Sequence, residues 1–66
     1  MIKIKLNGEE KDLHEMTIYN LLLDLKIDPS AIVVEQNMNI VSKESFMSTD
    51  INNGDTIELI RFVGGG

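Results

Sequence analysis

The group in this sequence best suited to chemistry is a run of glycines at its end. Three glycines, Gly64, Gly65 and Gly66, follow the apolar pair Phe62-Val63. Glycine loses more backbone entropy on ordering than any other residue, so folding alone gives no reason for three in a row. Without Cβ atoms, the segment could pass through a narrow channel into the active site of a partner. We therefore interpret Gly64 and Gly65 as the approach and the carboxylate of Gly66 as the reacting group.

A carboxylate becomes reactive when one of its oxygens is turned into a leaving group. Adenylation by ATP does this, with magnesium and cationic groups of a partner enzyme stabilising the phosphoryl charge. The acyl adenylate can then be attacked by sulfur, an amine or a thiol. A Gly-Gly end alone is also compatible with a cloning remnant or an unused tail, so the rest of the sequence has to decide.

Other groups for catalysis or metal binding are few. The sequence has no cysteine and one histidine, His14, so a transition-metal site lacks its usual ligands. The acidic residues are scattered, with no spacing typical of a calcium loop or a carboxylate pair. Gly8 and Gly54 fall in predicted hairpin turns and not in a phosphate-binding loop before a helix. We predict a protein that is not an enzyme, holds no cofactor and leaves ATP to its partner.

The elements that present the tail begin with a predicted hairpin. Residues 1–6 alternate between apolar and charged side chains, the pattern of a strand with one buried face. Asn7-Gly8 is the pair most typical of a two-residue hairpin turn. A second strand from Glu9 to about His14 is weakly apolar, so we assign it to an edge of the sheet.

A helix is predicted after Thr17, whose hydroxyl is suited to cap the first turn. Apolar residues then recur at helical spacing: Ile18, Leu21, Leu22 and Leu25. The helix should end near Lys26, because Pro29 disfavours helical geometry in the residue before it.

The middle of the chain predicts two strands and a loop. Residues 31–37 form a largely apolar run suited to a central strand, and residues 40–41 form a short one. Residues 42–50 have no clear period. We expect a loop there with one helical turn, and with Phe46 and Met47 directed inward.

The last strand, over residues 56–62, follows a predicted glycine turn at 52–55. Ile60 and Phe62 fall on the face opposite to its core-facing residues, just before Val63 and the glycines. Clustered apolar side chains beside such an end indicate a docking surface for a partner protein. The alternative is that a loop or the twist of the strand covers them.

This order of elements predicts an α+β fold, with four or five strands in a mixed sheet and one main helix across it. If the first and last strands pair in parallel at the centre, the fold is a β-grasp (ubiquitin-like) fold, which the pattern alone does not establish. Sixty-six residues with 42% apolar content suit one small core. We assign residues 1–62 to the domain and residues 63–66 to a flexible glycine tail.

The charge of the chain bears on its partners. Eleven acidic and six basic residues give a net charge of −5. A phosphate backbone would repel such a surface, so we expect no nucleic acid. Solubility and attraction to a basic partner protein both fit the charge. Because no run approaches a membrane span, the first ten residues do not resemble a signal peptide and cysteine is absent, we expect a cytoplasmic protein with no membrane partner.

The order and spacing of these features resemble the ThiS family of sulfur carrier proteins for thiamine biosynthesis. The stretch VVEQNMNIVSKESF is similar to the family's strand, asparagine turn and Lys-Glu-aromatic pattern, and INNGDTIELIRFVGGG to its last turn, strand and Gly-Gly end. The hairpin IKLNGEE and the helix TIYNLLLDL also fit, so the resemblance covers the whole chain. Ser42, where a proline is common, and Asn53, in place of an aspartate, depart from the pattern without touching the tail.

The resemblance implies a β-grasp fold and a mechanism. An E1-like adenylating enzyme (ThiF-like), which binds ATP, would activate the carboxylate of Gly66. Sulfur from cysteine, through the persulfide of a cysteine desulfurase, would convert it to a thiocarboxylate. Thiazole synthase (ThiG-like) would then take that sulfur into the thiazole ring. Partner docking would involve Ile60, Phe62 and Val63, with Gly64 and Gly65 entering the partner's active site.

Three other functions use the same features. A sulfur carrier for molybdopterin has the same fold, tail and chemistry, although RFVGGG suits the thiazole family better. A ubiquitin-like modifier would be activated in the same way but would end in an isopeptide bond to a lysine. A plain β-grasp binding module would not use its tail, so deleting the glycines would change nothing.

Overall fold

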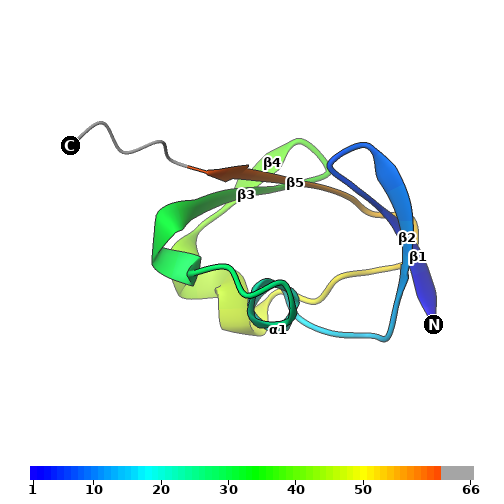
Figure 1. The fold of residues 1–66 in the computed structure, drawn as a ribbon, viewed down its shortest axis with the longest axis horizontal. Helices are drawn as coiled ribbons and strands as arrows, with labels where there is room; N and C mark the ends of the chain where they lie inside the picture. Colours follow the sequence, from blue (N-terminus) through cyan, green and yellow to red (C-terminus); the bar gives the residue numbers. More distant parts are fainter. Residues whose placement is uncertain (62–66) are drawn as a thin grey trace.

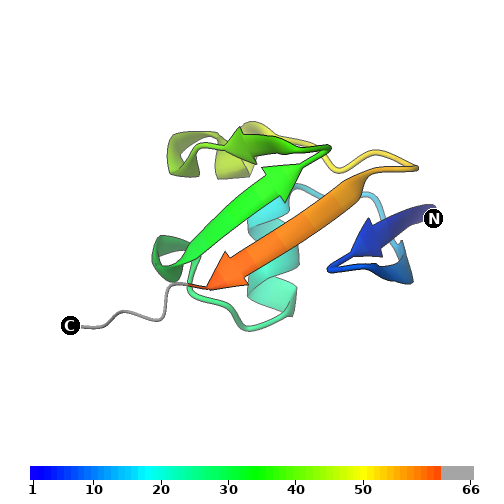
Figure 2. The same ribbon diagram turned by 90° about the horizontal axis from the view of Figure 1, so that it is seen from above.

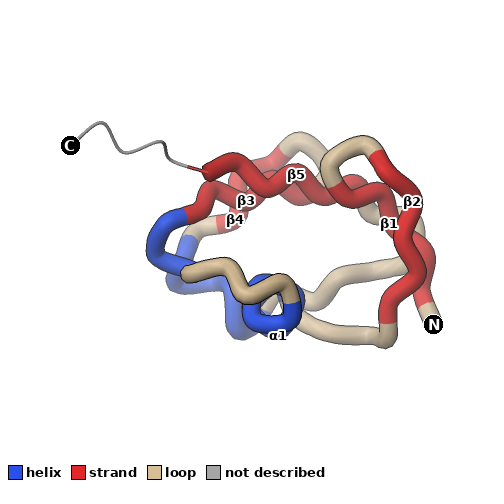
Figure 3. Tube along the Cα trace, in the orientation of Figure 1, coloured by secondary structure: helices blue, strands red, loops and turns tan. Residues whose placement is uncertain are grey.

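Five strands form one mixed sheet in the order β2-β1-β5-β3-β4. The structure is a computed structural model that describes residues 1–61. Its strands are β1 (Ile2–Leu6), β2 (Glu9–Leu13), β3 (Ile32–Gln36), β4 (Asn39–Val41) and β5 (Thr56–Arg61). Its helices are α1 (Ile18–Asp24) and two 3₁₀ turns, η1 (Pro29–Ala31) and η2 (Lys43–Ser48). These helices lie on one side of the sheet, which leaves its other face uncovered (Figures 1 and 3).

The first and last strands are neighbours at the centre of the sheet. They pair in parallel, with Lys5 opposite Thr56 and Leu6 opposite Ile57. The β1–β2 and β3–β4 pairs are antiparallel hairpins, and β3 and β5 are also antiparallel. The predicted α+β class, the parallel central pair and the β-grasp fold are therefore confirmed. The edge position of β2 is confirmed as well, although the strand ends at Leu13, one residue before His14.

The first hairpin forms as its sequence predicts. Asn7 has φ 48° and Gly8 has φ 84°, the left-handed pair that a tight hairpin turn requires. Gly54, with φ 88°, confirms the predicted glycine turn that precedes β5. The N–H of Gly54 donates to the carbonyl of Lys3 at 2.8 Å, so this second turn sets the start of β5 beside β1 (Figure 2).

The helix α1 begins and ends with identifiable caps. The hydroxyl of Thr17 accepts a hydrogen bond from the N–H of Asn20 at 3.2 Å, as predicted. At the other end Lys26 is left-handed, with φ 59°. The N–H groups of Lys26 and Ile27 donate to the carbonyls of Leu23 and Leu22, at 3.0 and 2.9 Å, which is a Schellman motif. The predicted end of the helix near Lys26 is confirmed. The helix ends because of this cap, however, and Pro29 lies three residues after Lys26.

The core lies between the covered face of the sheet and these helices. Its buried apolar residues are Ile2, Ile4, Leu13, Ile18, Leu21, Leu22, Ile32, Val34, Phe46, Ile51 and Ile57. Phe46 is buried as predicted, but the prediction for Met47 is wrong, since its side chain is 71% exposed. In a 3₁₀ helix successive side chains point about 120° apart. Phe46 and Met47 therefore cannot both face the core, and Met47 points the same way as the exposed Glu44.

Candidate functional site

The strand that leads to the glycine tail begins at a buried carboxylate. Asp55 is 7% exposed. Its Oδ2 accepts hydrogen bonds from Nε2 of Gln36 and from the N–H of Asn52, both at 2.8 Å. Its Oδ1 accepts one from Nδ2 of Asn37 at 2.9 Å. Burial raises the pKa of Asp55, but these three hydrogen bonds outweigh it and hold the pKa below its ordinary value.

Asn37 completes this polar cluster at the start of β5. Its Oδ1 accepts from the N–H of Thr56 at 2.9 Å, and its own N–H donates to the carbonyl of Thr56 at 2.8 Å. Sequence analysis gave Asp55 no role of its own. The available signal in the sequence was an aspartate after a glycine turn, together with two amide residues, Gln36 and Asn37, at the end of the apolar run 31–37. The cluster joins the β3–β4 turn to the loop before β5, and so fixes where β5 starts.

The second half of β5 is held less completely. The strand β1 ends at Leu6, and beyond it the side chain of Asn7 makes one more hydrogen bond to β5. The Oδ1 of Asn7 accepts from the N–H of Leu59 at 2.8 Å. Beyond that point only β3 pairs with β5, as far as Ile32 opposite Arg61. The strand therefore approaches the tail with a strand partner on one side (Figure 2).

The end of β5 exposes an apolar side chain on the uncovered face of the sheet. Ile57 is buried and Leu59 packs against the core, so Ile60 falls on the opposite face, where it is 47% exposed. Its cross-strand neighbour there is the half-buried Val33. No described segment covers Ile60, which removes the alternative of a buried position. Phe62, which was assigned to the same docking surface, lies outside the described residues.

The rest of the predicted tail also lies outside the described residues. These residues are Val63, Gly64, Gly65 and Gly66. What the structure places is the strand from which they continue, as far as Arg61.

Two glutamates lie beside Ile60 on the same face. Glu35 of β3 is directly opposite Glu58 of β5, and Ile40 of β4 is directly opposite Glu35 on its other side. Both glutamates are half-buried, and Ile40 is 71% exposed. We call these five residues, Val33, Glu35, Ile40, Glu58 and Ile60, the open-face patch. Sequence analysis missed all of them except Ile60, because their proximity depends on strand register.

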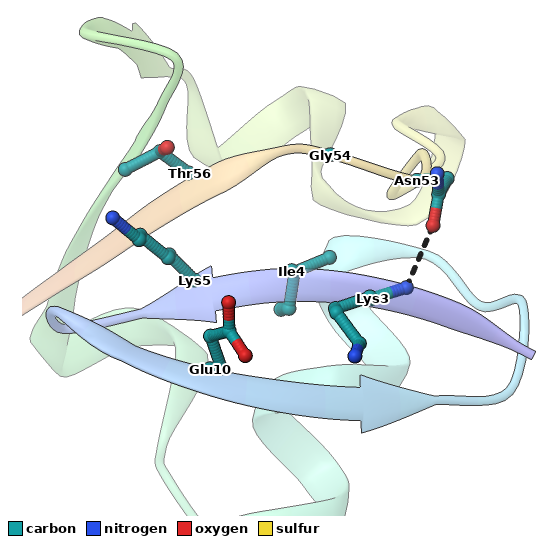
Figure 4. Close-up of a pocket in the computed structure, with 7 residues that line it drawn as sticks. All are labelled: Lys3, Ile4, Lys5, Glu10, Asn53, Gly54 and Thr56. Carbon is teal, nitrogen blue, oxygen red and sulfur yellow. Dashed lines mark hydrogen bonds between the residues drawn. The ribbon is translucent and has the colours of Figure 1, made fainter.

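A shallow hollow lies at the other end of this face, between β1 and the start of β5. It has a volume of about 420 Å³, and it is lined by Lys3, Ile4, Lys5, Glu10, Asn53, Gly54 and Thr56. The backbone N–H of Lys3 donates to Oδ1 of Asn53 at 2.8 Å, which joins β1 to the loop before β5 (Figure 4).

Further features of residues 1–61 limit what the site can do. Within that range, no three histidine or carboxylate side chains gather closely enough to hold a metal ion. His14 is exposed, just after β2. None of the described helices has the length and apolar character needed to cross a membrane.

Comparison with known proteins gives consistent results. The model of the ThiS family matches residues 4–66. The sulfur carrier protein ThiS of Bacillus subtilis is 34% identical over 67 residues, covering 96% of this chain and 98% of that protein. The thiazole synthase of Paramagnetospirillum magneticum is 39% identical over 66 residues, or 98% of this chain. This chain spans only 20% of the length of that synthase.

Solved structures agree with the sequence comparisons. The crystal structure of the thiamine biosynthesis protein ThiS from Geobacter metallireducens matches with a TM-score of 0.85 at 28% sequence identity. The match covers 98% of this chain and 100% of that one.

Proposed function

This chain belongs to the ThiS family, and on that premise we propose that it is a sulfur carrier protein of thiamine biosynthesis, with the sulfur carried on the carboxyl group of Gly66. The observation that carries the proposal is the extent of the family match, which runs from residue 4 through residue 66. It includes both the folded part and the three glycines. The named relatives, a sulfur carrier and a thiazole synthase, favour thiazole formation over the molybdopterin alternative.

The first chemical step is activation of the carboxylate. An oxygen of the Gly66 carboxylate attacks the α-phosphorus of ATP in an E1-like adenylating enzyme, and pyrophosphate leaves. The acyl adenylate has AMP as its leaving group. Magnesium and cationic side chains of the enzyme stabilise the phosphoryl charge, as they do in other phosphate chemistry. The chain supplies only the carboxylate, and its glycines allow that carboxylate to reach the ATP.

The second step exchanges oxygen for sulfur. The terminal sulfur of a persulfide, formed by a cysteine desulfurase, attacks the carbonyl carbon of Gly66, and AMP leaves. A second thiol then attacks the resulting acyl disulfide, so that a new disulfide forms and a thiocarboxylate remains on Gly66. Thiazole synthase takes its sulfur from this thiocarboxylate. In this scheme the chain is a reagent and not a catalyst.

The folded domain has the task of presenting the tail. We assign residues 1–62 to the domain and 63–66 to a flexible tail, with Ile60, Phe62 and Val63 in the docking surface. Gly64 and Gly65 carry no side chains, so they can enter a channel too narrow for other residues. The polar cluster around Asp55 supports this role, because it holds β5 at the end remote from the tail.

Mass spectrometry tests the proposal directly. The purified chain is incubated with the adenylating enzyme, ATP and a persulfide donor, with Bacillus subtilis ThiS as a parallel positive control. We expect a mass increase that corresponds to replacement of one oxygen by sulfur, mapped to Gly66. A variant lacking Gly65 and Gly66 should fold normally and remain unmodified.

Other outcomes of this experiment identify other functions. An unmodified chain beside a modified control would contradict the proposal and favour a plain binding module. A branched peptide joining Gly66 to a lysine would favour a protein modifier. Transfer of the sulfur to a pterin precursor, and not into a thiazole, would favour the molybdopterin carrier.

A further inference from the structure

The open face of the sheet contains a pair of like charges in direct opposition. Glu35 and Glu58 are paired residues of the antiparallel strands β3 and β5. The Cβ atoms of such a pair lie about 4.5–5.5 Å apart, and like charges there destabilise the sheet. Among residues 1–61, neither carboxylate has a hydrogen-bond or ion-pair partner. The folded domain therefore gains nothing from this arrangement.

The other end of the same face is arranged in the opposite way. In the β1–β2 hairpin Lys3 is opposite Asp12, and Lys5 is opposite Glu10. Opposite charges in this position stabilise a strand pair. The open face thus has complementary charge pairs on the β1–β2 hairpin and a repelling pair between β3 and β5, the strand from which the tail continues.

Apolar side chains flank the repelling pair on two sides. Ile60, with Val33 beside it, lies on the tail side of Glu58, and Ile40 lies beyond Glu35. Ile60 is 47% exposed and Ile40 is 71% exposed. No helix covers this face (Figures 1 and 2). The open-face patch is therefore two half-buried carboxylates with apolar side chains on two sides, and a partner that buries it must supply positive charge.

We propose that the open-face patch binds an arginine on an apolar surface of the adenylating enzyme, an inference that rests on the proposed function. A guanidinium group has five N–H donors in a planar fork, so one arginine can bridge both carboxylates. Its alkyl stem can pack against Ile60 while its head group lies between Glu35 and Glu58. Binding then removes the repulsion that the free domain retains.

The adenylating enzyme is the partner that this chemistry fits. A tail of glycines has no side chains to be recognised, so selectivity must come from the folded domain. An active site that stabilises the phosphates of ATP is cationic, which complements an acidic face on a chain of net charge −5. From Ile60 the six residues to Gly66 reach at most about 20 Å. The arginine must therefore lie close to the ATP site.

Steady-state ATP–pyrophosphate exchange with the purified adenylating enzyme measures this contact. For Glu58→Lys and for Glu35→Lys, we expect the KM for the chain to rise about tenfold, equal to about 1.4 kcal/mol, with kcat within about twofold. Glu10→Lys, with the same change of charge on the same face, is the matched control and should change KM by less than about twofold. Added salt should raise the wild-type KM more steeply than that of Glu58→Lys.

Each contrary result has a distinct meaning. Equal KM values for folded Glu58→Lys and Glu10→Lys, with active wild type, would overturn the patch proposal and leave the proposed function intact. Normal adenylation with slower sulfur transfer to thiazole synthase would overturn the assignment to the adenylating enzyme. Absence of exchange with wild type, where Bacillus subtilis ThiS is active, would overturn both proposals.

Discussion

Directly before its start, β5 is hydrogen-bonded through Asp55 to two other segments, one that contains Gln36 and Asn37 and one that contains Asn52. At its end β5 is paired with β3 alone and exposes Ile60. The start contains a buried charge with every hydrogen bond satisfied. The end contains Glu58, a half-buried charge opposed by another of the same sign. The start of the strand is thus held by the hydrogen bonds of Asp55, whereas near its end Glu58 faces Glu35 with no opposite charge between them.

This difference separates stability from recognition along six residues of one strand. Substitutions at the start should reduce the free energy of unfolding without changing how the folded protein meets its partner. Substitutions at the end should weaken binding to the partner with little change in the free energy of unfolding.

Replacing Asp55 should have the largest effect on stability. Asp55→Ala leaves the amides of Gln36 and Asn37 and the N–H of Asn52 without their acceptor. Unpaired buried donors cost about 1–3 kcal/mol each, and partial hydration will offset some of that, so we expect a loss of roughly 2–4 kcal/mol in urea unfolding. The exposed Asp24→Ala is the control, with a change below about 0.5 kcal/mol. A loss equal to that of the control would show that the cluster does not hold the start of β5.

Replacing Ile60 should affect recognition most. Ile60→Asp adds a third carboxylate to the open-face patch and removes an apolar contact, so the KM in ATP–pyrophosphate exchange should rise about tenfold or more. The free energy of unfolding should change by less than about 1 kcal/mol, because the side chain is already 47% exposed. Leu23→Asp is a matched control, since Leu23 is 48% exposed on the helix side of the sheet. An equal rise in KM for both variants would contradict a specific role for Ile60.

Acid should weaken the start of β5 selectively. The folded pKa of Asp55 lies below its ordinary value of 3.8, so the unfolded chain binds the proton more tightly. Its contribution to stability is therefore present above the unfolded pKa and is lost as pH falls through the folded pKa. Urea unfolding between about pH 6 and pH 2 should show a smaller loss of stability for Asp55→Ala than for wild type. Parallel pH curves for the two proteins would contradict this account.

The smallest effect is expected midway along β5, where Asn7 substitutes for a strand. Asn7→Gly keeps a residue suited to φ 48° but removes the acceptor for the N–H of Leu59. We expect a loss of about 0.5–1.5 kcal/mol and faster amide hydrogen exchange at Leu59. Asn7→Asp retains an oxygen in that position and should protect the amide. Unchanged exchange in Asn7→Gly would mean that β3 alone orders the second half of the strand.

Several of the predictions from sequence that are confirmed rest on interactions between residues close in the chain. The alternation in residues 1–6, the Asn7-Gly8 turn and the Thr17 cap each involve groups within a few positions of one another. Such contacts form with the same geometry in many folds. The prediction for Met47 is wrong because residues 42–50 have no clear period, and an expected loop with one helical turn did not specify which of Phe46 and Met47 faces the core.

By itself the sequence determined the order of elements, because residue type sets the hydrophobic period of each segment. It also determined the chemistry available to the tail, because glycines have no side chains and leave the terminal carboxylate accessible. Only the tertiary structure decided which charges meet. Glu35 and Glu58 are distant in sequence, and their opposition depends on the register of β3 against β5. A shift of that register by one residue would place them on opposite faces, since side chains alternate along a strand. Packing of Val34 and Ile57 in the core selects the register, and with it the charge that the open face presents.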